Sequence, residues 1–208
     1  MADPAPRSPL VELTAVMGRL RVECDWKAAQ THRTLARHLL EETYETLEAI
    51  DTGDQAHLRE ELGDLLLQVY FHAAIAAENG EFDIDDVARD LLAKLVRRNP
   101  HVFGEASASG AAQVNELWES VKATEKQRGS VLDGIPPQLP ALAYADKVLE
   151  RLARRPSVME PAEATQQTVS TGSSTELLGD RLLALVAECR AAGVDPEQSL
   201  RDAVRRLL

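Results

Sequence analysis

Two pairs of carboxylates offer the clearest chemistry in this sequence. Residues 41–64 contain nine acidic residues and a single basic one. Glu42 and Glu45 are three residues apart, and Glu61 and Asp64 repeat that spacing, which on a helix places each pair on one face. Acidic runs are commonly solvated helix faces, but this repeated spacing favours a site built from paired carboxylates.

The second pair lies on a helix, expected over residues 55–79, that is apolar around most of its circumference. Such a helix belongs in a protein interior. From residue 61 to residue 74 its polar residues fall on one stripe, which consists of Glu61, Asp64, Gln68 and His72. Two mostly buried carboxylates without a basic partner on their own helix need a cation. Four carboxylate ligands from two helices form an oxygen-only site, which suits Mg²⁺ or Mn²⁺.

A di-iron helical bundle is the competing interpretation of such a carboxylate cluster. That site normally uses a Glu-x-x-His pair on two of its helices. No glutamate in this sequence is followed three residues later by histidine. His72 lies eight residues after Asp64, and we interpret it as a histidine of the core or one beside the ligands, rather than as a ligand.

The elements that must position these residues are all predicted to be helices. Apolar residues recur at helical spacing, strand-like alternation is missing, and aromatic residues make up 4% of the chain. The turn at 52–54 makes the two carboxylate helices antiparallel neighbours. The sequence predicts an all-α fold with helices at 10–22, 31–51, 55–79, 84–98, 111–128, 138–154 and 176–208, the last broken near Gly193.

Composition narrows the range of partners. The chain has 208 residues and a formal net charge of -11, which argues against a dedicated nucleic-acid binder. No apolar run approaches the roughly 20 residues that span a bilayer, and the N-terminus has no signal-peptide pattern. Cys24 and Cys189 are interpreted as reduced thiols. We therefore expect a cytoplasmic protein with no membrane partner.

Four segments are predicted along the chain. Residues 1–9 form a disordered tail, residues 10–155 the main domain, and residues 156–175, which lack Lys and Arg, a flexible linker. Residues 176–208 read as the degenerate remnant of a repeat, because Gly179-Asp180 echoes Gly63-Asp64. We expect this remnant either to dock and modulate access to the site or to be a passive appendage.

Several separate motifs resemble those of the MazG family of all-α nucleoside triphosphate pyrophosphohydrolases. Residues 41–45 and 61–64 read EETYE and ELGD, similar to the family's EExxE…ExxD signature. Residues 24–32, CDWKAAQTH, resemble CPWDxxQTH, with Asp25 in place of the usual proline. Residues 97–104 resemble RRHPHVF, and Trp118-Glu119 with Lys122 resembles a W-E-x-x-K helix. The similarity covers about residues 10–155.

This resemblance implies a set of roles. Glu42, Glu45, Glu61 and Asp64 would bind Mg²⁺, for which Mn²⁺ could substitute, and Glu41 would hold a further metal or help to activate water. The phosphates would be bound by Lys94, Arg97 and Arg98. Trp118 and Lys122 would complete the nucleotide site. The reaction would convert nucleoside triphosphates to the monophosphate and pyrophosphate, and the antiparallel helix bundle would be completed by a homodimer.

Some of these residues have alternative interpretations. Lys94, Arg97 and Arg98 form a basic cluster that could bind phosphates or simply offset a helix dipole. Either Trp26 or Trp118 could stack on a nucleobase or belong to the core or an interface. A broad substrate range, with a role in sanitising nucleotide pools, is the leading expectation. A narrower dUTP or phosphoribosyl-ATP pyrophosphohydrolase and an inactive helical regulator are the alternatives.

Overall fold

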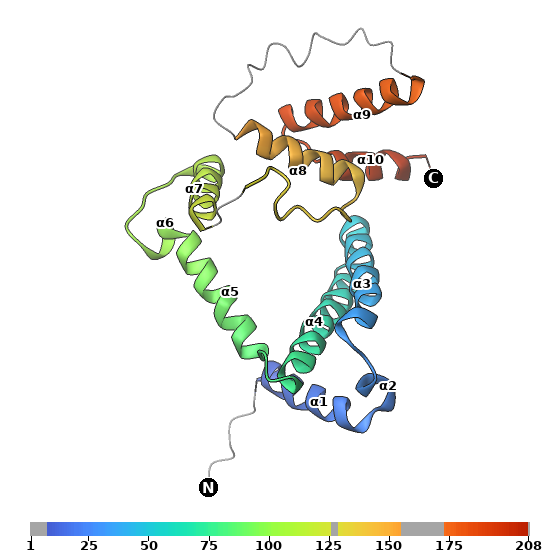
Figure 1. The fold of residues 1–208 in the computed structure, drawn as a ribbon, viewed down its shortest axis with the longest axis vertical. Helices are drawn as coiled ribbons and strands as arrows, with labels where there is room; N and C mark the ends of the chain where they lie inside the picture. Colours follow the sequence, from blue (N-terminus) through green and yellow to red (C-terminus); the bar gives the residue numbers. More distant parts are fainter. Residues whose placement is uncertain (1–7, 126–128, 155–172, 208) are drawn as a thin grey trace. The chain divides into compact units, whose positions relative to one another are not determined.

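The computed structural model describes residues 8–125, 129–154 and 173–207, and the regular structure in these ranges is entirely α-helical (Figure 1). The all-α prediction is confirmed. The chain divides into two compact units, residues 1–123 and 124–208. Among the described residues, no helix is both long enough and apolar enough to cross a membrane. The first unit holds α1 (Pro9–Glu23), α2 (Asp25–Ala28), α3 (His32–Thr52), α4 (Gln55–Glu78), α5 (Ile84–Arg98), α6 (Pro100–Phe103) and most of α7 (Gly110–Glu125).

Helices α3 and α4 form an antiparallel hairpin whose ends are defined by local sequence. The Thr31 side chain accepts from the backbone N–H of Thr34 in a capping box that starts α3. Gly53 ends this helix with φ 73°, a left-handed conformation that glycine adopts without steric cost. The Asp54 carboxylate then caps α4 by accepting from the backbone N–H groups of Ala56 and His57.

The core of the first unit lies where α1 packs against the hairpin. Met17 of α1, Leu35 of α3 and Phe71 of α4 are almost completely buried and belong to one hydrophobic cluster. The Tyr70 hydroxyl donates to the Leu10 carbonyl oxygen at 2.9 Å, which fixes the beginning of α1 to the middle of α4. The packing of α1 covers one side of α4, and the side that carries Glu61 packs against α3.

Helix α5 follows α4 after a short turn and diverges from the hairpin (Figure 1). Asp83 and Asp86 form the capping box that begins it. It ends at Asn99, because the residue before a proline disfavours helical geometry. Pro100 then begins the short helix α6.

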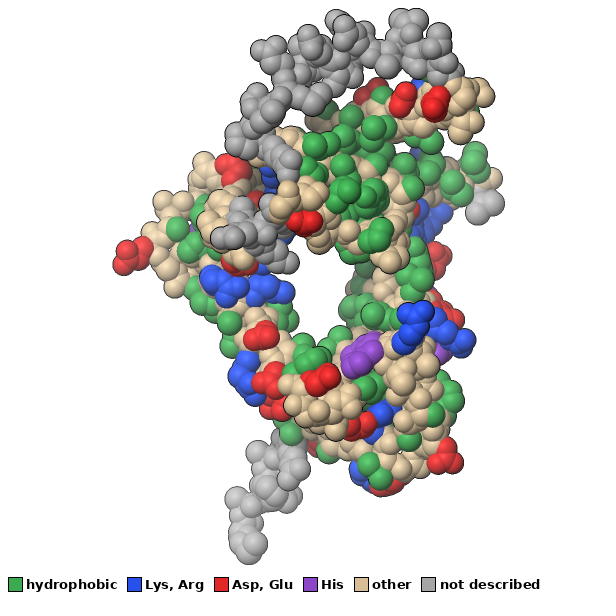
Figure 2. All heavy atoms as spheres, in the orientation of Figure 1, with side chains coloured by type: hydrophobic (Ala, Val, Ile, Leu, Met, Phe, Trp, Pro, Cys, Tyr) green, Lys and Arg blue, Asp and Glu red, His purple; other side chains and the backbone are tan. Residues whose placement is uncertain are grey.

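The second unit contains α8 (Ala141–Ala153), α9 (Ser174–Ala191) and α10 (Pro196–Arg205), and each of these helices packs against the other two. Arg190 of α9 pairs with Asp146 of α8 at 3.1 Å. Val186 is almost completely buried, whereas Leu178, Leu182 and Leu185 of α9 are exposed. Hydrophobic side chains accordingly gather over α8 and α9 in Figure 2.

The described helix boundaries agree with the predicted ones to within a few residues. The break near Gly193 is confirmed, since this residue has φ 69° between α9 and α10. The four-residue helices α2 and α6 were not predicted, because one turn is too short to show a periodicity. The last residues of the predicted helix 111–128 lie outside the described residues.

Two of the predicted segment boundaries differ from those of the structure, and the predicted division into domains stays a prediction. The tail 1–9 and the linker 156–175 fall mostly outside the described residues, but Pro9 begins α1 and Ser174 begins α9. Both corrections have local causes: proline suits a first helical position, and Ser173 caps α9. Helix α8 packs with α9 and α10, although the predicted main domain extends to residue 155. The division into a catalytic domain and a degenerate repeat stays a prediction.

Candidate active site

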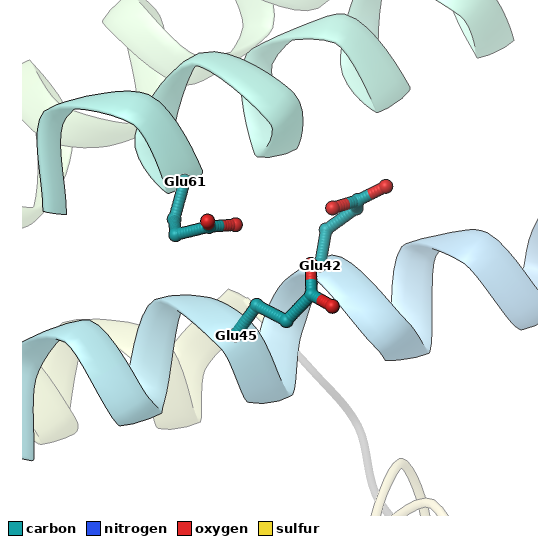
Figure 3. A group of neighbouring side chains, drawn as sticks. All are labelled: Glu42, Glu45 and Glu61. Atoms are coloured by element: carbon teal, nitrogen blue, oxygen red, sulfur yellow. The ribbon is translucent and has the colours of Figure 1, made fainter. Parts of the chain in front are cut away.

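Three of the predicted carboxylates converge between α3 and α4. Glu42 and Glu45 come from α3 and Glu61 comes from α4, and each offers an oxygen within 4.8 Å of the other two. Figure 3 shows Glu61 pointing from α4 toward α3, where the two other side chains lie. The helical hairpin thus brings together groups separated by a turn in the sequence.

A buried threonine holds the two helices together beside this cluster. The Thr46 hydroxyl donates to the Glu42 carbonyl oxygen at 2.8 Å and lies 3.5 Å from the Glu61 carbonyl oxygen. Ala49, one turn further along α3, is fully buried, and its small side chain permits close approach of the helices. These contacts fix the backbones from which the carboxylates project.

The electrostatics of the cluster favour a bound cation. Burial raises the pKa of Glu42, and the neighbouring carboxylates of Asp64, Glu45 and Glu61 raise this pKa further. Glu61 is only 7% exposed, and its Oε1 lies 3.1 Å from Nε2 of His57. Its Oε2 is buried without a hydrogen-bond partner in the part of the chain that the structure describes. An oxygen-only donor set with an unpaired buried oxygen fits Mg²⁺ or Mn²⁺.

Asp64 and Glu41 lie beside this group rather than in it. Asp64 is half-buried and close enough to Glu42 to raise its pKa, but it is not among the three converging side chains. Glu41 is exposed, and its Oε2 lies 3.4 Å from Nδ1 of His38. Their predicted roles as a fourth metal ligand and as an auxiliary carboxylate stay predictions.

The predicted phosphate-binding residues gather at another place in the first unit. Lys94, Arg97 and Arg98 lie in the last part of α5, which diverges from the hairpin (Figure 1). The guanidinium carbon of Arg98 lies 5.4 Å from the centre of the Trp118 ring. Lys122 pairs with Glu119 one turn along α7, at 2.9 Å. Basic side chains accordingly gather near the end of α5 in Figure 2.

Trp26 lies against the hairpin that carries the carboxylates. Trp26 is 54% exposed, and its ring meets the rings of His38 and Phe71 edge to face, with centroids 6.0 and 6.5 Å away. His38 precedes Glu42 by one turn of α3. The two tryptophans therefore occupy different surroundings, and Trp26 is the one close to the carboxylates.

Two further features were not predicted from the sequence. Arg21 of α1 contacts Glu78, at the end of α4, and the backbone carbonyls of Lys27 in α2 and Gln30 just after it. His32 contacts His72 across the hairpin. Glu78 lies 57 residues from Arg21, and His72 lies 40 residues from His32, so neither helical periodicity nor local spacing gives a signal for these two pairs.

The helical hairpin and its converging carboxylates define an all-α protein with an acidic cluster that could hold a metal ion. Residues 30–103 match the MazG nucleotide pyrophosphohydrolase domain. The nucleoside triphosphate pyrophosphohydrolase/pyrophosphatase MazG of Thermotoga maritima is 38% identical over 212 residues, covering 95% of this chain and 82% of that protein. An uncharacterized 26.1 kDa protein of Streptomyces cacaoi, from the blaB 3' region, is 45% identical over 201 residues, covering 95% and 79%.

Among solved structures, a mazG-related protein from Thermotoga maritima is 27% identical, with a TM-score of 0.47 over 54% of this chain and 97% of that one. The sequence matches establish the relationship. The chain belongs to the MazG family of nucleotide pyrophosphohydrolases. The resemblance inferred from the sequence motifs is thereby confirmed.

Proposed function

We propose that this protein hydrolyses nucleoside triphosphates to the nucleoside monophosphate and pyrophosphate, using Mg²⁺ bound by Glu42, Glu45, Glu61 and Asp64. The convergence of three carboxylates from two antiparallel helices, in a member of this family, is the observation that carries the proposal. A divalent cation bound there would lower the pKa of its water and offset the charge on the phosphates. Mn²⁺ should substitute, since it accepts the same oxygen ligands.

The chain's own cations would complete the substrate site. A triphosphate carries roughly four negative charges, which isolated carboxylates would repel. Lys94, Arg97 and Arg98 would bind the phosphates as charged hydrogen-bond donors. Lys122 would add a further donor. In this proposal Glu41 assists from the edge of the carboxylate group.

Aromatic side chains would contact the rest of the nucleotide. Trp26 and Trp118 each present a ring on which a base could stack, a contact that tolerates different bases. This tolerance supports a broad substrate range of canonical and non-canonical nucleotides, with sanitation of nucleotide pools as the cellular role.

Pyrophosphate detection with Mg²⁺ and a panel of eight nucleoside triphosphates tests the proposed function. We expect release from most of the panel and none when EDTA removes the metal. Release from dUTP alone would contradict the broad range and favour a narrower enzyme. An absence of release from all eight would favour an inactive helical regulator, unless phosphoribosyl-ATP is cleaved.

A second copy of the chain would cover apolar residues that the hairpin leaves open. Leu40 and Tyr44 of α3 and Leu62 and Val69 of α4 are exposed, and a helical hairpin of this kind is commonly completed to a four-helix bundle by a symmetric partner. We therefore propose a homodimer or a higher homo-oligomer. Light scattering at micromolar concentration should give at least twice the mass of one chain, and a monomer would refute the proposal.

We also propose that α9 and α10 derive from a second copy of α4 and α5. Gly80 and Gly193 adopt nearly equal positive φ angles of 71° and 69° after the first helix of each pair. Asp83 and Asp195 then cap the second helix of each pair. Since Leu177 stands where Glu61 would be, this copy lacks the carboxylate pair and would not be a second active site.

A further inference from the structure

Arg21 is a charged residue whose side chain is only 7% exposed. Its Nε and Nη2 donate to the two carboxylate oxygens of Glu78 at 2.7 and 2.6 Å. Its Nη1 donates to the backbone carbonyl oxygens of Lys27 and Gln30, the latter at 3.1 Å. All three nitrogens of the guanidinium therefore donate hydrogen bonds. The hydrogen bond to Glu78 raises the pKa of Arg21 above its ordinary value.

These contacts join three parts of the first unit. Arg21 projects from α1, Glu78 ends α4, and the two carbonyls belong to the connection between α1 and α3, residues 24–31. Only a planar guanidinium has the fork of donors that this arrangement needs. A lysine would keep the charge near Glu78, but it has a single nitrogen and could not serve both carbonyls and the carboxylate in this geometry.

The connection that Arg21 holds has little stability of its own. Its one helix, α2, is a single turn, and so short a helix is not stable without tertiary contacts. The Gln30 side-chain amide donates to the Trp26 carbonyl oxygen at 2.9 Å. Arg21 thus fixes Gln30, and Gln30 in turn fixes the backbone of Trp26.

The Trp26 ring packs on the same residue as the arginine. Phe71 is 2% exposed, and the centre of its ring lies 5.9 Å from the guanidinium carbon of Arg21. The same ring meets the Trp26 ring edge to face. Trp26 also meets His38, which lies four residues, or about 6 Å of helix rise, before Glu42. In a nucleotide whose phosphates lie at the carboxylates, the nucleoside part would extend over about this distance.

We propose that Arg21 is a positioning residue for nucleotide binding, which holds residues 24–31 so that Trp26 contacts the nucleoside part of the substrate. This inference rests on the proposed function, in which Trp26 belongs to the substrate site. Arg21 contacts Glu78, two backbone carbonyls and the Phe71 ring, and none of these is a carboxylate of the metal cluster. It therefore sets substrate affinity rather than turnover.

Arg21→Lys tests this directly, with Arg19→Lys as its matched control. Arg19 lies two residues earlier on α1, its side chain is 76% exposed, and it pairs with Glu23 one turn along the same helix at 2.8 Å. Arg21→Lys should raise KM about tenfold and change kcat by less than about twofold, whereas Arg19→Lys should match the wild type. A variant that merely lost folded protein would show a lower kcat at constant KM, and that result would overturn the proposal.

Fluorescence of Trp26 gives a readout that does not depend on turnover. In a Trp118→Phe background, Arg21→Lys should shift the Trp26 emission and make it easier to quench with acrylamide, because residues 24–31 are released. Arg19→Lys should leave both unchanged. Equal emission and quenching in Arg21→Lys and its parent would overturn the proposal, whether or not the protein hydrolyses nucleotides.

Glu78→Ala keeps the test informative if Arg21→Lys fails to fold. Glu78 is 45% exposed and anchors Arg21 from the solvent side, so its loss should be tolerated. KM should rise in the same direction but by less, since the two carbonyl contacts remain. A wild-type KM in Glu78→Ala would count against the proposal, whereas an absence of pyrophosphate release by the wild type would overturn the proposed function alone.

Discussion

The Nδ1 atoms of His32 and His72 lie 2.7 Å apart, and the two ring planes differ by 1°. This contact joins the first residue of α3 to α4, 40 residues further along the chain. A hydrogen bond between these atoms needs a proton on one nitrogen and a lone pair on the other. The pair therefore cannot form when both rings are fully protonated.

Stability should fall at mildly acidic pH because of this pair. Burial, and then the proximity of His32, lowers the pKa of His72 below its ordinary value of 6.5. As the pH falls through that value, the unfolded chain takes up a proton that the folded chain does not, and the free energy of unfolding decreases. The loss should stay well below the limit of about 1.4 kcal/mol per pH unit for one proton, because partial exposure screens the ring.

Urea unfolding between pH 7.5 and 5.5 measures this effect. His72→Phe should have a smaller decrease in stability over that interval than the wild type. His101→Gln, which changes a histidine of α6, controls for the removal of any one histidine. An equal pH dependence in His72→Phe and the wild type would contradict the assignment.

Neutralising Glu42 should stabilise the metal-free protein. Its pKa is raised by burial and by three neighbouring carboxylates, so the folded state loses stability as the pH rises above the ordinary value of 4.5 and the charge develops. In EDTA at pH 7.5, Glu42→Gln should melt about 1–3 °C higher than the wild type. Mg²⁺ should raise the melting temperature of the wild type more than that of the variant.

Glu12→Gln provides the control for this change, because Glu12 is an exposed carboxylate on α1 outside the cluster. It should leave both the melting temperature in EDTA and the response to Mg²⁺ close to those of the wild type. A lower melting temperature for Glu42→Gln in EDTA would show that the Glu42 charge is not repelled in the folded state.

Removing the charge of Glu61, the buried member of the carboxylate cluster, should abolish most of the pyrophosphate release. Glu61→Gln keeps the shape of the side chain but supplies a neutral ligand, and we expect pyrophosphate release at saturating Mg²⁺ to fall at least about a hundredfold. Even groups that only orient metal ligands are worth roughly 10- to 100-fold. Glu60→Gln, at the adjacent exposed position, should retain near-normal turnover, and equal activities of the two variants would refute the site.

Thr46 should contribute to stability beyond its local helix. Thr46→Val preserves the shape of the side chain but removes the hydroxyl between the Glu42 and Glu61 carbonyl oxygens, which should cost about 1 kcal/mol of unfolding free energy. Thr43→Val is the matched control, since its exposed hydroxyl donates to the Leu39 carbonyl oxygen at 2.6 Å, within α3. Chemical denaturation that gave the two variants the same loss would contradict a role between helices.

Much of the fold is local and could be predicted. Capping by Asp83, termination at Gly53 and the stop before Pro100 depend on residues within one turn of each other, so the sequence alone sets these boundaries. The pairing of Glu42 with Glu45 follows in the same way from helical geometry. The short turn between the two helices then predicts that Glu61 lies opposite them.

The tertiary structure decided which of the candidate residues meet. Asp64 has the same spacing from Glu61 as Glu45 has from Glu42, but its side chain lies outside the group of three. The angle and rotation of packed helices determine such differences, and local spacing does not contain them.

The sequence by itself therefore determined the helices, the carboxylate pairs and the family motifs, because these depend on neighbours along the chain. Only the tertiary structure placed Trp26 beside the carboxylate hairpin, and Trp118 against Arg98. It alone paired Arg21 with Glu78, which lies 57 residues away. Such contacts arise when packed helices bury distant side chains together, and a buried charge is then stabilised by whichever partner the packing brings within reach.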